Sequence, residues 1–474
     1  MPKPKAPACC YRWDRRARDT AWRRSVWPCH PTRSVGFPCR WSCLAAIWAA
    51  TVVLFAAAAG GCAREDEPST TVLRVANWTG PDVEPGLVRL ERQFRQEFEA
   101  AHPGVRLQME QIPGYGQYTP KLLMMHVAGC MPDVIHLDAS AAAVFIDNGV
   151  LRDLTPLIES DPQFDLTQYF EPVVEVARRG SSLYAIPLDF TPMMMFYNKR
   201  LFDEAHVAYP QAGWTWDEFL QKAKALTVRP AGAARPTQYG FYFENWMPLW
   251  VLWLWTNGAD VLDPDGRRAS GYFDGPQSVE AVEFIVELMT KHRVAPDLRD
   301  SAIAGTDLFR SGRAAMDLKG HWMLLDYRAD GLDVGVVPLP VRGREEAAER
   351  ERATVVYAAG LAVTAASRQS QLAWEYVKFM TSRDVQVRRV ASGLAISGNK
   401  LAAAQFAGTP IEDAFLAEVA YARPPWGARV ERYPFLEELG REMMEDLLHA
   451  RGTLSVAEAL RRTVRLMDAA LAEP

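Results

Sequence analysis

Cysteine is nearly absent from most of this 474-residue chain. Six of its seven cysteines, at positions 9, 10, 29, 39, 43 and 62, fall within the first 62 residues. Only Cys130 remains beyond them, so no intramolecular disulfide can form there. His126, Cys130 and His136 have a spacing that zinc could use, but a mid-helix position and a strand position would point the histidines in different directions. We therefore expect no metal, no cofactor, and a core stabilised by burial alone.

Basic charge is also scarce beyond residue 62. The first 62 residues carry a net charge of +8, whereas the remainder holds 43 basic and 56 acidic residues, a net charge of −13. An acidic body excludes nucleic-acid binding through a phosphate-neutralising surface. The chain has no HExxH, GxSxG or P-loop pattern, which argues against an enzyme, and it has no internal repeat beyond residue 62.

Long apolar runs are absent except at residues 44–59, which follow Arg40 and carry no charge. A basic segment, an apolar stretch and small residues before a cut describe a secretory signal, and this stretch is too short to favour a membrane span. The segment Ala59-Gly60-Gly61-Cys62 resembles a bacterial lipobox. That resemblance implies lipidation of Cys62 and a lipid anchor at the cell membrane, on its periplasmic or extracellular face. Ala59 stands where leucine is usual, so plain secretion is the alternative.

The region before the apolar run has no periodicity. One hypothesis is that the start within residues 1–40 is wrongly assigned and that the true start lies downstream, for instance at a non-standard codon for Val35. Residues 1–62 are then the leader, and the acidic, turn-rich residues 63–70 are expected to be a tether.

The body beyond the tether alternates strand and helix patterns. Apolar residues in 72–76, 105–109 and 133–138 predict strands, and apolar residues at helical spacing between the first two predict a helix. This order indicates an α/β fold with helices covering a largely parallel sheet. Capping boxes at 215–218 and 455–458 predict two further helix starts.

Several segments, in order, resemble the family 1 extracellular solute-binding proteins, the group that includes maltose-binding protein. The most specific is Tyr197-Asn198-Lys199-Arg200-Leu201-Phe202-Asp203-Glu204-Ala205, which continues to Trp214-Thr215-Trp216-Asp217-Glu218-Phe219. Further blocks lie at 98–105, 257–266, 309–322 and 362–381. Together they cover most of 71–470.

The resemblance implies two α/β lobes around a cleft, a type II periplasmic-binding-protein-like fold in which the lobes close by hinge motion. We place lobe 1 at 71–188 plus 319–379 and lobe 2 at 189–318 plus 380–474, with crossings near Asp189, Leu318 and Phe379. The implied function is capture of a sugar for an ABC importer by a monomer that docks on the membrane permease subunits.

Sugar binding needs aromatic rings for C–H faces and carboxylates for hydroxyl groups. Asp138 ends a strand, where open α/β sheets place ligands, and helix capping is its alternative role. The resemblance adds Asp189 and Trp246, the latter with Glu244. It also adds Trp322 and the cleft glycine Gly360. The remaining candidates are aromatic residues in turns and loops: Trp78, Tyr115, Tyr118, Trp426 and Tyr433.

Three other functions stay open at this point. Asp138 and Asp189 could be the acid–base pair of a glycosidase. The ligand could be a non-sugar solute such as a glycerol phosphodiester or a peptide; a phosphate would need clustered arginines or a helix N-terminus at the cleft, and Arg429 and Arg432 are candidates. A sensor subunit that presents its ligand to a membrane receptor is the third.

Overall fold

The structure is a computed structural model of the full chain, and the leader with Cys62 lies outside the residues it describes. It describes residues 70–78, 85–112, 115–297, 306–343, 351–391, 393, 395–449 and 453–473.

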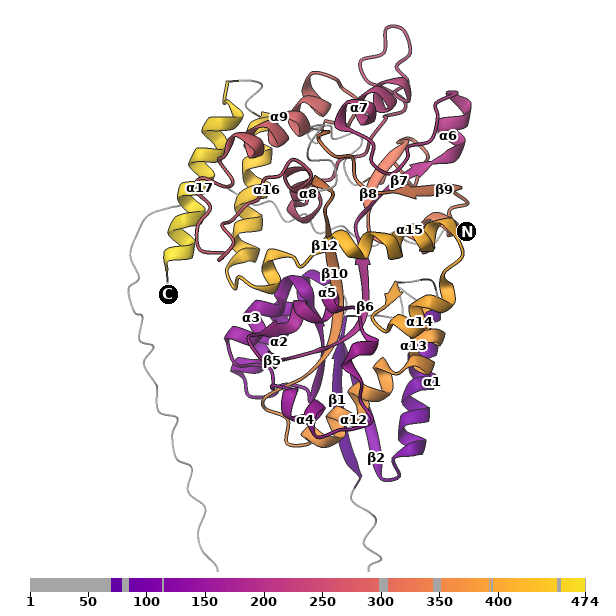
Figure 1. Ribbon diagram of the computed structural model, residues 1–474, viewed down its shortest axis with the longest axis vertical. Coiled ribbons are helices and arrows are strands. Elements are labelled where there is room, and N and C mark those ends of the chain that lie inside the picture. Colours follow the sequence, from indigo (N-terminus) through magenta and orange to yellow (C-terminus); the bar gives the residue numbers. More distant parts are fainter. Residues whose placement is uncertain are drawn as a thin grey trace, which may run out of the picture. The chain divides into compact units, whose positions relative to one another are not determined.

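The first lobe is built on a seven-stranded sheet with the order β11-β6-β10-β3-β1-β2 and with β12 beside β10 (Figure 1). Its strands are β1 (Thr71–Asn77), β2 (Val105–Gln111), β3 (Val134–Asp138), β6 (Ile186–Pro192), β10 (Thr354–Val363), β11 (Ile396–Ser397) and β12 (Ala422–Arg423). The first three strands pair in parallel, as the alternation predicted, but β10 is antiparallel to both β3 and β6. The sheet is therefore mixed rather than largely parallel.

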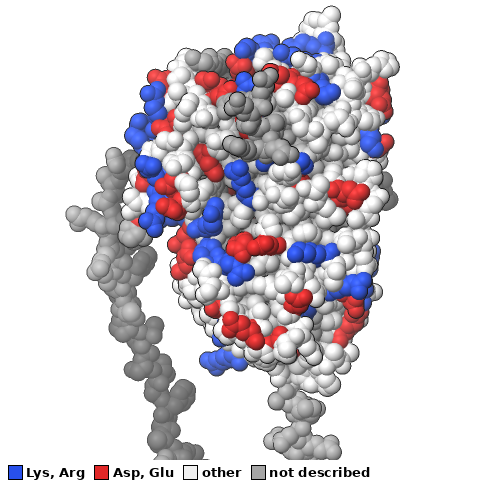
Figure 2. Space-filling model, in the orientation of Figure 1, with Lys and Arg blue, Asp and Glu red and all other residues white. Residues whose placement is uncertain are grey.

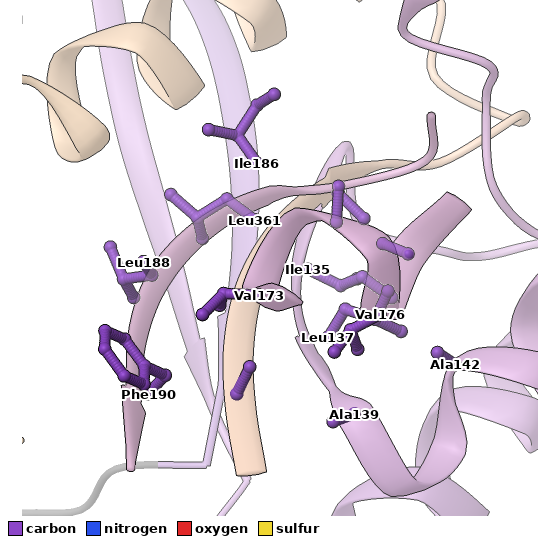
Figure 3. Close-up of a cluster of buried hydrophobic side chains, with 14 of the residues drawn as sticks. Ile135, Leu137, Ala139, Ala142, Val173, Val176, Ile186, Leu188, Phe190 and Leu361 are labelled. Carbon is purple, nitrogen blue, oxygen red and sulfur yellow. The ribbon is translucent and has the colours of Figure 1, made fainter. Parts of the chain in front are cut away.

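Helices pack around this sheet. They are α1 (Pro85–Ala101), α2 (Tyr115–Val127), α3 (Ala142–Asp147), α4 (Thr155–Glu159), α5 (Glu171–Val174), α12 (Ser370–Thr381), α13 (Arg383–Val390) and α14 (Lys400–Ala403). Phe94 and Phe98 are the predicted apolar stripe of α1, and both are buried. Figure 3 shows the core beside the sheet, where Leu137 on β3 and Phe190 on β6 lie among aliphatic side chains.

The second lobe has a three-stranded sheet in which β7 (Met194–Asn198) pairs antiparallel with β8 (Met316–Lys319) and β9 (Val334–Val337). Its helices are α6 (Lys199–Glu204), α7 (Trp216–Ala225), α8 (Met247–Trp255), α9 (Pro276–Thr290), α10 (Met323–Ala329), α15 (Pro410–Glu418), α16 (Tyr433–His449) and α17 (Val456–Ala472). Both predicted capping boxes are confirmed, at Thr215 before α7 and Ser455 before α17. Every residue of α8 is buried, which explains its apolar sequence on all faces.

Strand pairing differs from the predicted lobe boundaries at two places. Residues 319–337 include the end of β8 and all of β9, which pair with β7 in the second lobe rather than with the first-lobe sheet. Residues 383–397 were assigned to lobe 2, yet β11 pairs with β6 and α13 packs on α1. The chain returns to the first-lobe sheet at β10, where Thr354 and Val355 pair with β12 and Val356–Leu361 pairs with β6.

Charged side chains of both signs are interspersed on the face in Figure 2, without a broad basic area. No helix among the described residues is both long and apolar enough to cross a membrane.

Candidate functional site

A cavity of about 340 Å³ lies where the large sheet of the first lobe meets the second lobe. Its lining residues are Trp78, His136, Asp138, Asp189, Phe190, Thr191, Trp246, Trp322, Tyr357, Ala358, Ala359, Arg389 and Ala395. The volume is at the small end of the range of ligand sites, which is about 300–1,000 Å³. Five of the predicted binding residues meet here: Trp78, Asp138, Asp189, Trp246 and Trp322.

A larger hollow of about 900 Å³ lies in the second lobe between the ends of α9, α16 and α17. Its lining contains Arg229, Arg235 and Arg293 above aliphatic side chains. The described residues that bound it come from one lobe, so movement between the lobes cannot close it over a ligand. We therefore take the smaller cavity as the candidate site.

Aromatic rings from both lobes line the candidate site. Trp246 is the N-cap residue of α8 and stacks on Tyr357 of β10, with ring centroids 5.7 Å apart and an interplanar angle of 23°. Trp78 follows β1 and meets the ring of His136 edge to face, at 5.3 Å. Rings contributed by both lobes can hold the flat apolar face of a small ligand between them.

A buried ion-pair network forms the polar part of the lining. Arg389 on α13 is 6% exposed at its side chain and contacts Asp189 at 2.8 Å and Glu91 at 3.8 Å. Burial and the nearby Arg389 lower the pKa of His136 to about 3, so its imidazole is neutral at pH 7. The guanidinium charge of Arg389 is thus shared with two carboxylates on β6 and α1.

Asp138 has the capping role that was its alternative, and it also lines the cavity. It ends β3 and caps the following 3₁₀ turn, where its Oδ1 accepts from the Ser140 backbone N–H at 2.8 Å and from the Ser140 hydroxyl. Its side chain also lines the cavity. Capping holds the carboxylate in one orientation, which favours a fixed hydrogen-bond acceptor at this edge of the site.

Residues 319–322 form a turn that carries Trp322 and is held from three sides. Lys319 forms an ion pair with Glu244. The backbone N–H of His321 donates to Thr191 Oγ1 at 2.7 Å, and its Nε2 lies 2.9 Å from Glu412 Oε2. These contacts fix the turn to the loop before α8, to β6 and to α15.

Gly320 permits the fold of this turn. A Cβ atom at that position would overlap the indole ring of Trp322, so the ring can lie back over the turn only because the residue is glycine. The turn therefore sets where Trp322 meets the cavity.

Five of the predicted residues lie outside the cavity lining, four of them for a packing reason. Tyr118 is buried, and its hydroxyl donates to the carbonyl oxygens of Ala76 and His136. Trp426 is also buried, and its Nε1 donates to Asp260 at 2.7 Å.

Tyr433 packs in the second-lobe core. A Cβ on Gly360 would lie 3.0 Å from the Ala185 Cβ. The close packing of β10 therefore accounts for glycine at this position, and ligand access is not needed to explain it.

Glu244, the fifth such residue, forms an ion pair with Lys319 and does not line the cavity. The side chain of Tyr115 lies outside the described residues. Of the two arginines considered for an anionic ligand, Arg429 lies over the ring of Trp426 and Arg432 pairs with Glu473 at 2.9 Å. Neither of them lines the cavity.

The sequence interpretation missed eight lining residues: His136, Phe190, Thr191, Tyr357, Ala358, Ala359, Arg389 and Ala395. Alternation could have found His136, since it shares a strand face with the predicted Asp138. Arg389 gave no local signal, because its partner Asp189 is 200 residues away. No group of three or more His, Cys, Asp or Glu that could hold a metal occurs in the described part of the chain.

Comparisons with known proteins agree with this architecture. A binding protein of Brucella abortus (strain 2308) is 22% identical over 325 residues, covering 67% of this chain and 72% of the relative. The maltotriose-binding protein of Pyrococcus abyssi is 23% identical over 331 residues, covering 66% of this chain and 64% of its own length.

The solved structure of an ABC substrate-binding protein from Listeria monocytogenes in complex with cycloalternan has the same two-lobed fold, with a TM-score of 0.74 and 22% identity. The match covers 85% of this chain and 100% of that one. The model of the bacterial extracellular solute-binding proteins matches residues 85–387, more than half of the sequence. The chain belongs to this family of bacterial extracellular solute-binding proteins.

Proposed function

We propose that this protein is the substrate-binding component of an ABC importer and that it binds an uncharged sugar or short oligosaccharide in the cavity between its lobes. The observation that carries the proposal is the lining itself, in which Trp78, Trp246 and Trp322 face a space also reached by Asp138 and Asp189. Rings suit the C–H faces of a sugar, and carboxylates accept hydrogen bonds from its hydroxyl groups. The relatives named for maltotriose and cycloalternan support a carbohydrate as ligand.

Transport requires that ligand binding and lobe closure be coupled. A ligand that contacts Trp78 from the first lobe and Trp246 or Trp322 from the second stabilises only the arrangement in which both are near. Its free energy of binding is then differential between open and closed forms, which is the condition for a population shift. The closed form is the one that we expect to dock on the permease.

Catalysis is disfavoured by how the two cavity carboxylates are held. Asp138 accepts hydrogen bonds from Ser140, and Asp189 forms an ion pair with Arg389 at 2.8 Å. A glycosidase presents one carboxyl group as a proton donor to the leaving oxygen and the other to the opposite face of the sugar. The engaged state of both groups favours binding without cleavage.

An anionic solute is disfavoured because Arg389 shares its charge with Asp189 and Glu91. A phosphate site would instead present clustered arginines or a helix N-terminus to the ligand. The net charge of the ionisable lining residues is −1 with His136 neutral, and this negative charge does not favour an anionic ligand.

A thermal-shift screen of residues 63–474 against maltose, maltotriose, cellobiose, arabinobiose and glycerol 3-phosphate tests the proposal. A ligand present at about 100 times its Kd adds about 2.7 kcal/mol to the free energy of unfolding. A shift with a sugar, confirmed by isothermal titration and followed by recovery of intact sugar, is the expected result. Stabilisation by glycerol 3-phosphate alone, or cleavage of the bound sugar, would contradict the proposal.

We further infer that the protein is exported and lipid-anchored through Cys62. The apolar segment 44–59 and the Ala59-Gly60-Gly61-Cys62 sequence support this inference. Metabolic labelling with a radioactive fatty acid should mark the wild type, and the Cys62→Ser variant should carry no label. Equal labelling of both would refute an anchor at this residue.

A further inference from the structure

A short segment of the second lobe runs beside β8 and leads, as β8 does, to the candidate site. Residues 239–244 are parallel to β8 and to the residues just before it, with bridges from Tyr239 to Ala314 and from Tyr242 to Asp317. Since β8 is an edge strand of its three-stranded sheet, this segment covers the edge that β7 does not occupy. Two chain segments that are distant in sequence therefore end side by side.

Lys319 and Glu244 continue the register of these two segments. They are 75 residues apart in sequence, as are the two residues of each bridge. Side chains two residues apart on a strand point to the same face, so the pair lies on the same face as Asp317 and Tyr242. The Lys319 ammonium group donates to the Glu244 carboxylate, and the two side chains are 12% and 41% exposed. This ion pair joins the segments at the point where each of them turns.

Each of the two segments turns into a tryptophan of the cavity. Trp246 comes two residues after Glu244 and is the N-cap residue of α8, and its backbone N–H donates to the Glu244 carbonyl oxygen at 2.8 Å. Trp322 comes three residues after Lys319 and is the N-cap residue of α10. Both tryptophans line the cavity, whereas Lys319 and Glu244 do not. In this arrangement the ion pair can influence a ligand through the two rings.

The charge of Lys319 is secured by the acids around it. Burial disfavours the ammonium form, but the carboxyl groups of Asp317, Glu244 and Asp307 outweigh this effect and raise the pKa of Lys319. Its ammonium group is therefore charged at neutral pH. Loss of the Glu244 carboxylate would leave Lys319 beside Asp317, so the contact between the two segments can be removed without stranding a buried cation.

We propose that Lys319 is a positioning residue for sugar binding. Its ion pair with Glu244 holds the two tryptophan rings in one fixed arrangement, so that the second-lobe wall of the cavity is prepared before a sugar binds. Groups that are already ordered lose less conformational entropy on binding, and a ligand that stacks on both rings therefore binds more tightly when the pair is intact. The proposal rests on the proposed function, because it names residues that set the affinity of the same cavity.

The first measurement observes the two rings without a ligand. The protein is labelled with 5-fluorotryptophan, and the fluorine resonances of Trp246 and Trp322 are assigned by replacing each residue with phenylalanine. Glu244→Gln is observed at Trp322 and Lys319→Met at Trp246, so each substitution is observed at the tryptophan of the other segment. Both resonances should shift or broaden, because each ring loses its tie to the neighbouring segment.

Two control variants separate this effect from a general loss of charge or stability. Glu287→Gln breaks a pair with Lys291 that is 3.0 Å long, lies in the same lobe, and has a carboxylate side chain 40% exposed, which closely matches Glu244. Asp317→Asn removes another acid beside Lys319 but retains the pair with Glu244. Asp317→Asn should change the stability in urea, and neither control should move the two tryptophan resonances or change the affinity for sugar.

The second measurement is the Kd for maltose, maltotriose, cellobiose and arabinobiose by isothermal titration. Glu244→Gln and Lys319→Met should each weaken sugar binding about threefold to tenfold, as expected when a side chain must be ordered on binding. The double variant should bind no more weakly than the weaker single variant, because both substitutions remove the same contact. In a Trp322→Ala background either substitution should have less effect, since the pair acts through the rings. A direct contact between Glu244 and the sugar would cost the same in both backgrounds.

Unmoved resonances in both variants, or an unchanged affinity in both, would overturn the proposal while the sugar-binding function would stand. A loss of affinity in Glu244→Gln that is equally large in the Trp322→Ala background would also overturn it, because Glu244 would then bind the sugar itself. Circular dichroism shows whether Lys319→Met is folded; if it is not, Glu244→Gln alone decides between these outcomes. Failure of every sugar in the panel to bind would refute the proposed function and this inference with it, whatever the spectra show.

Discussion

Replacing Arg389 by methionine tests whether the ion-pair network in the cavity contributes to the stability of the first lobe. The substitution keeps much of the side-chain length and removes the charge that Asp189 contacts at 2.8 Å and Glu91 at 3.8 Å. The exposed fractions of the three side chains are 6%, 17% and 9%, so two carboxylates would remain buried without their cation. Breaking a buried pair by removing one partner costs about 3–5 kcal/mol.

Arg388 provides a matched control on the same helix. It forms a two-contact pair with Glu97 at 2.9 and 3.0 Å, but the side chains are 44% and 45% exposed. Exposed pairs contribute about 0–1 kcal/mol because water and salt screen them. Arg388→Met should therefore lower the free energy of unfolding by no more than about 1 kcal/mol, plus the loss of its contact with the ring of Phe94.

The assay is urea unfolding of the ligand-free proteins at pH 7, followed by tryptophan fluorescence and circular dichroism. The double variant Arg389→Met/Asp189→Asn should regain part of the loss, since only Glu91 then remains without its cation. Equal losses for the Arg388 and Arg389 variants would refute the burial argument. So would an additive double variant, which would show that Arg389 and Asp189 do not interact.

Three further predictions concern the site and the second-lobe core. Trp246→Ala and Trp322→Ala should each weaken sugar binding by about 1–3 kcal/mol in isothermal titration, whereas Trp426→Ala should reduce stability by about 3–5 kcal/mol without changing the affinity of the folded protein. Gly320→Ala should weaken binding by displacing the Trp322 ring, with little change in the urea midpoint, and a Kd equal to that of the wild type would disprove it. Burial raises the pKa of Asp317 to about 7, so wild-type stability should fall as the pH rises from about 4 through 7; Asp317→Asn should remove up to about 4 kcal/mol of this dependence in urea titrations across pH 4–8.

Local signals were enough to predict most of the elements around the site. A capping box depends on two residues that are three apart in sequence. The capping boxes that begin at Thr215 and Ser455 therefore predicted the starts of α7 and α17 correctly. Strand alternation likewise placed β1, β2 and β3 within one or two residues of their bounds. In both cases the information lies within a few neighbouring residues, which is what a sequence exposes directly.

Pairing between distant segments could not be predicted in the same way. β8 and β9 have four residues each, and their sequences do not indicate that they pair with β7 rather than with the first-lobe sheet. The assignment of residues 319–337 to the first lobe failed for this reason, whereas β10 and α12 lie in that lobe as assigned. Arg389 and Tyr357 were missed as lining residues because their neighbours Asp189 and Trp246 are more than a hundred residues away in sequence.

Aromatic residues in loops showed a different limit. Trp246 and Trp426 both lie in loop segments rich in turns, but the first lines the cavity while the second donates its indole N–H to Asp260 in the second lobe. Residue type and loop position were the same for both. The direction in which each ring points is decided by tertiary packing. Only the structure could therefore distinguish the loop aromatic residues that line the cavity from those that pack inside a lobe.

The strands that cross between the lobes also line the cavity, and this gives the fold a direct route from binding to closure. On β6 and β10, Phe190 pairs with Ala358 and Thr191 pairs with Tyr357, and all four line the site. Beyond these pairs β6 leads into β7 of the second lobe, and β10 begins where it pairs with β12. A change in the angle between the lobes must alter the backbone within a few residues of these paired positions. A ligand that fits one arrangement of the lobes therefore disfavours the others. The shape of the cavity, and hence its affinity for the ligand, therefore depends on the lobe angle through the backbone as well as through the tryptophans of the two lobes.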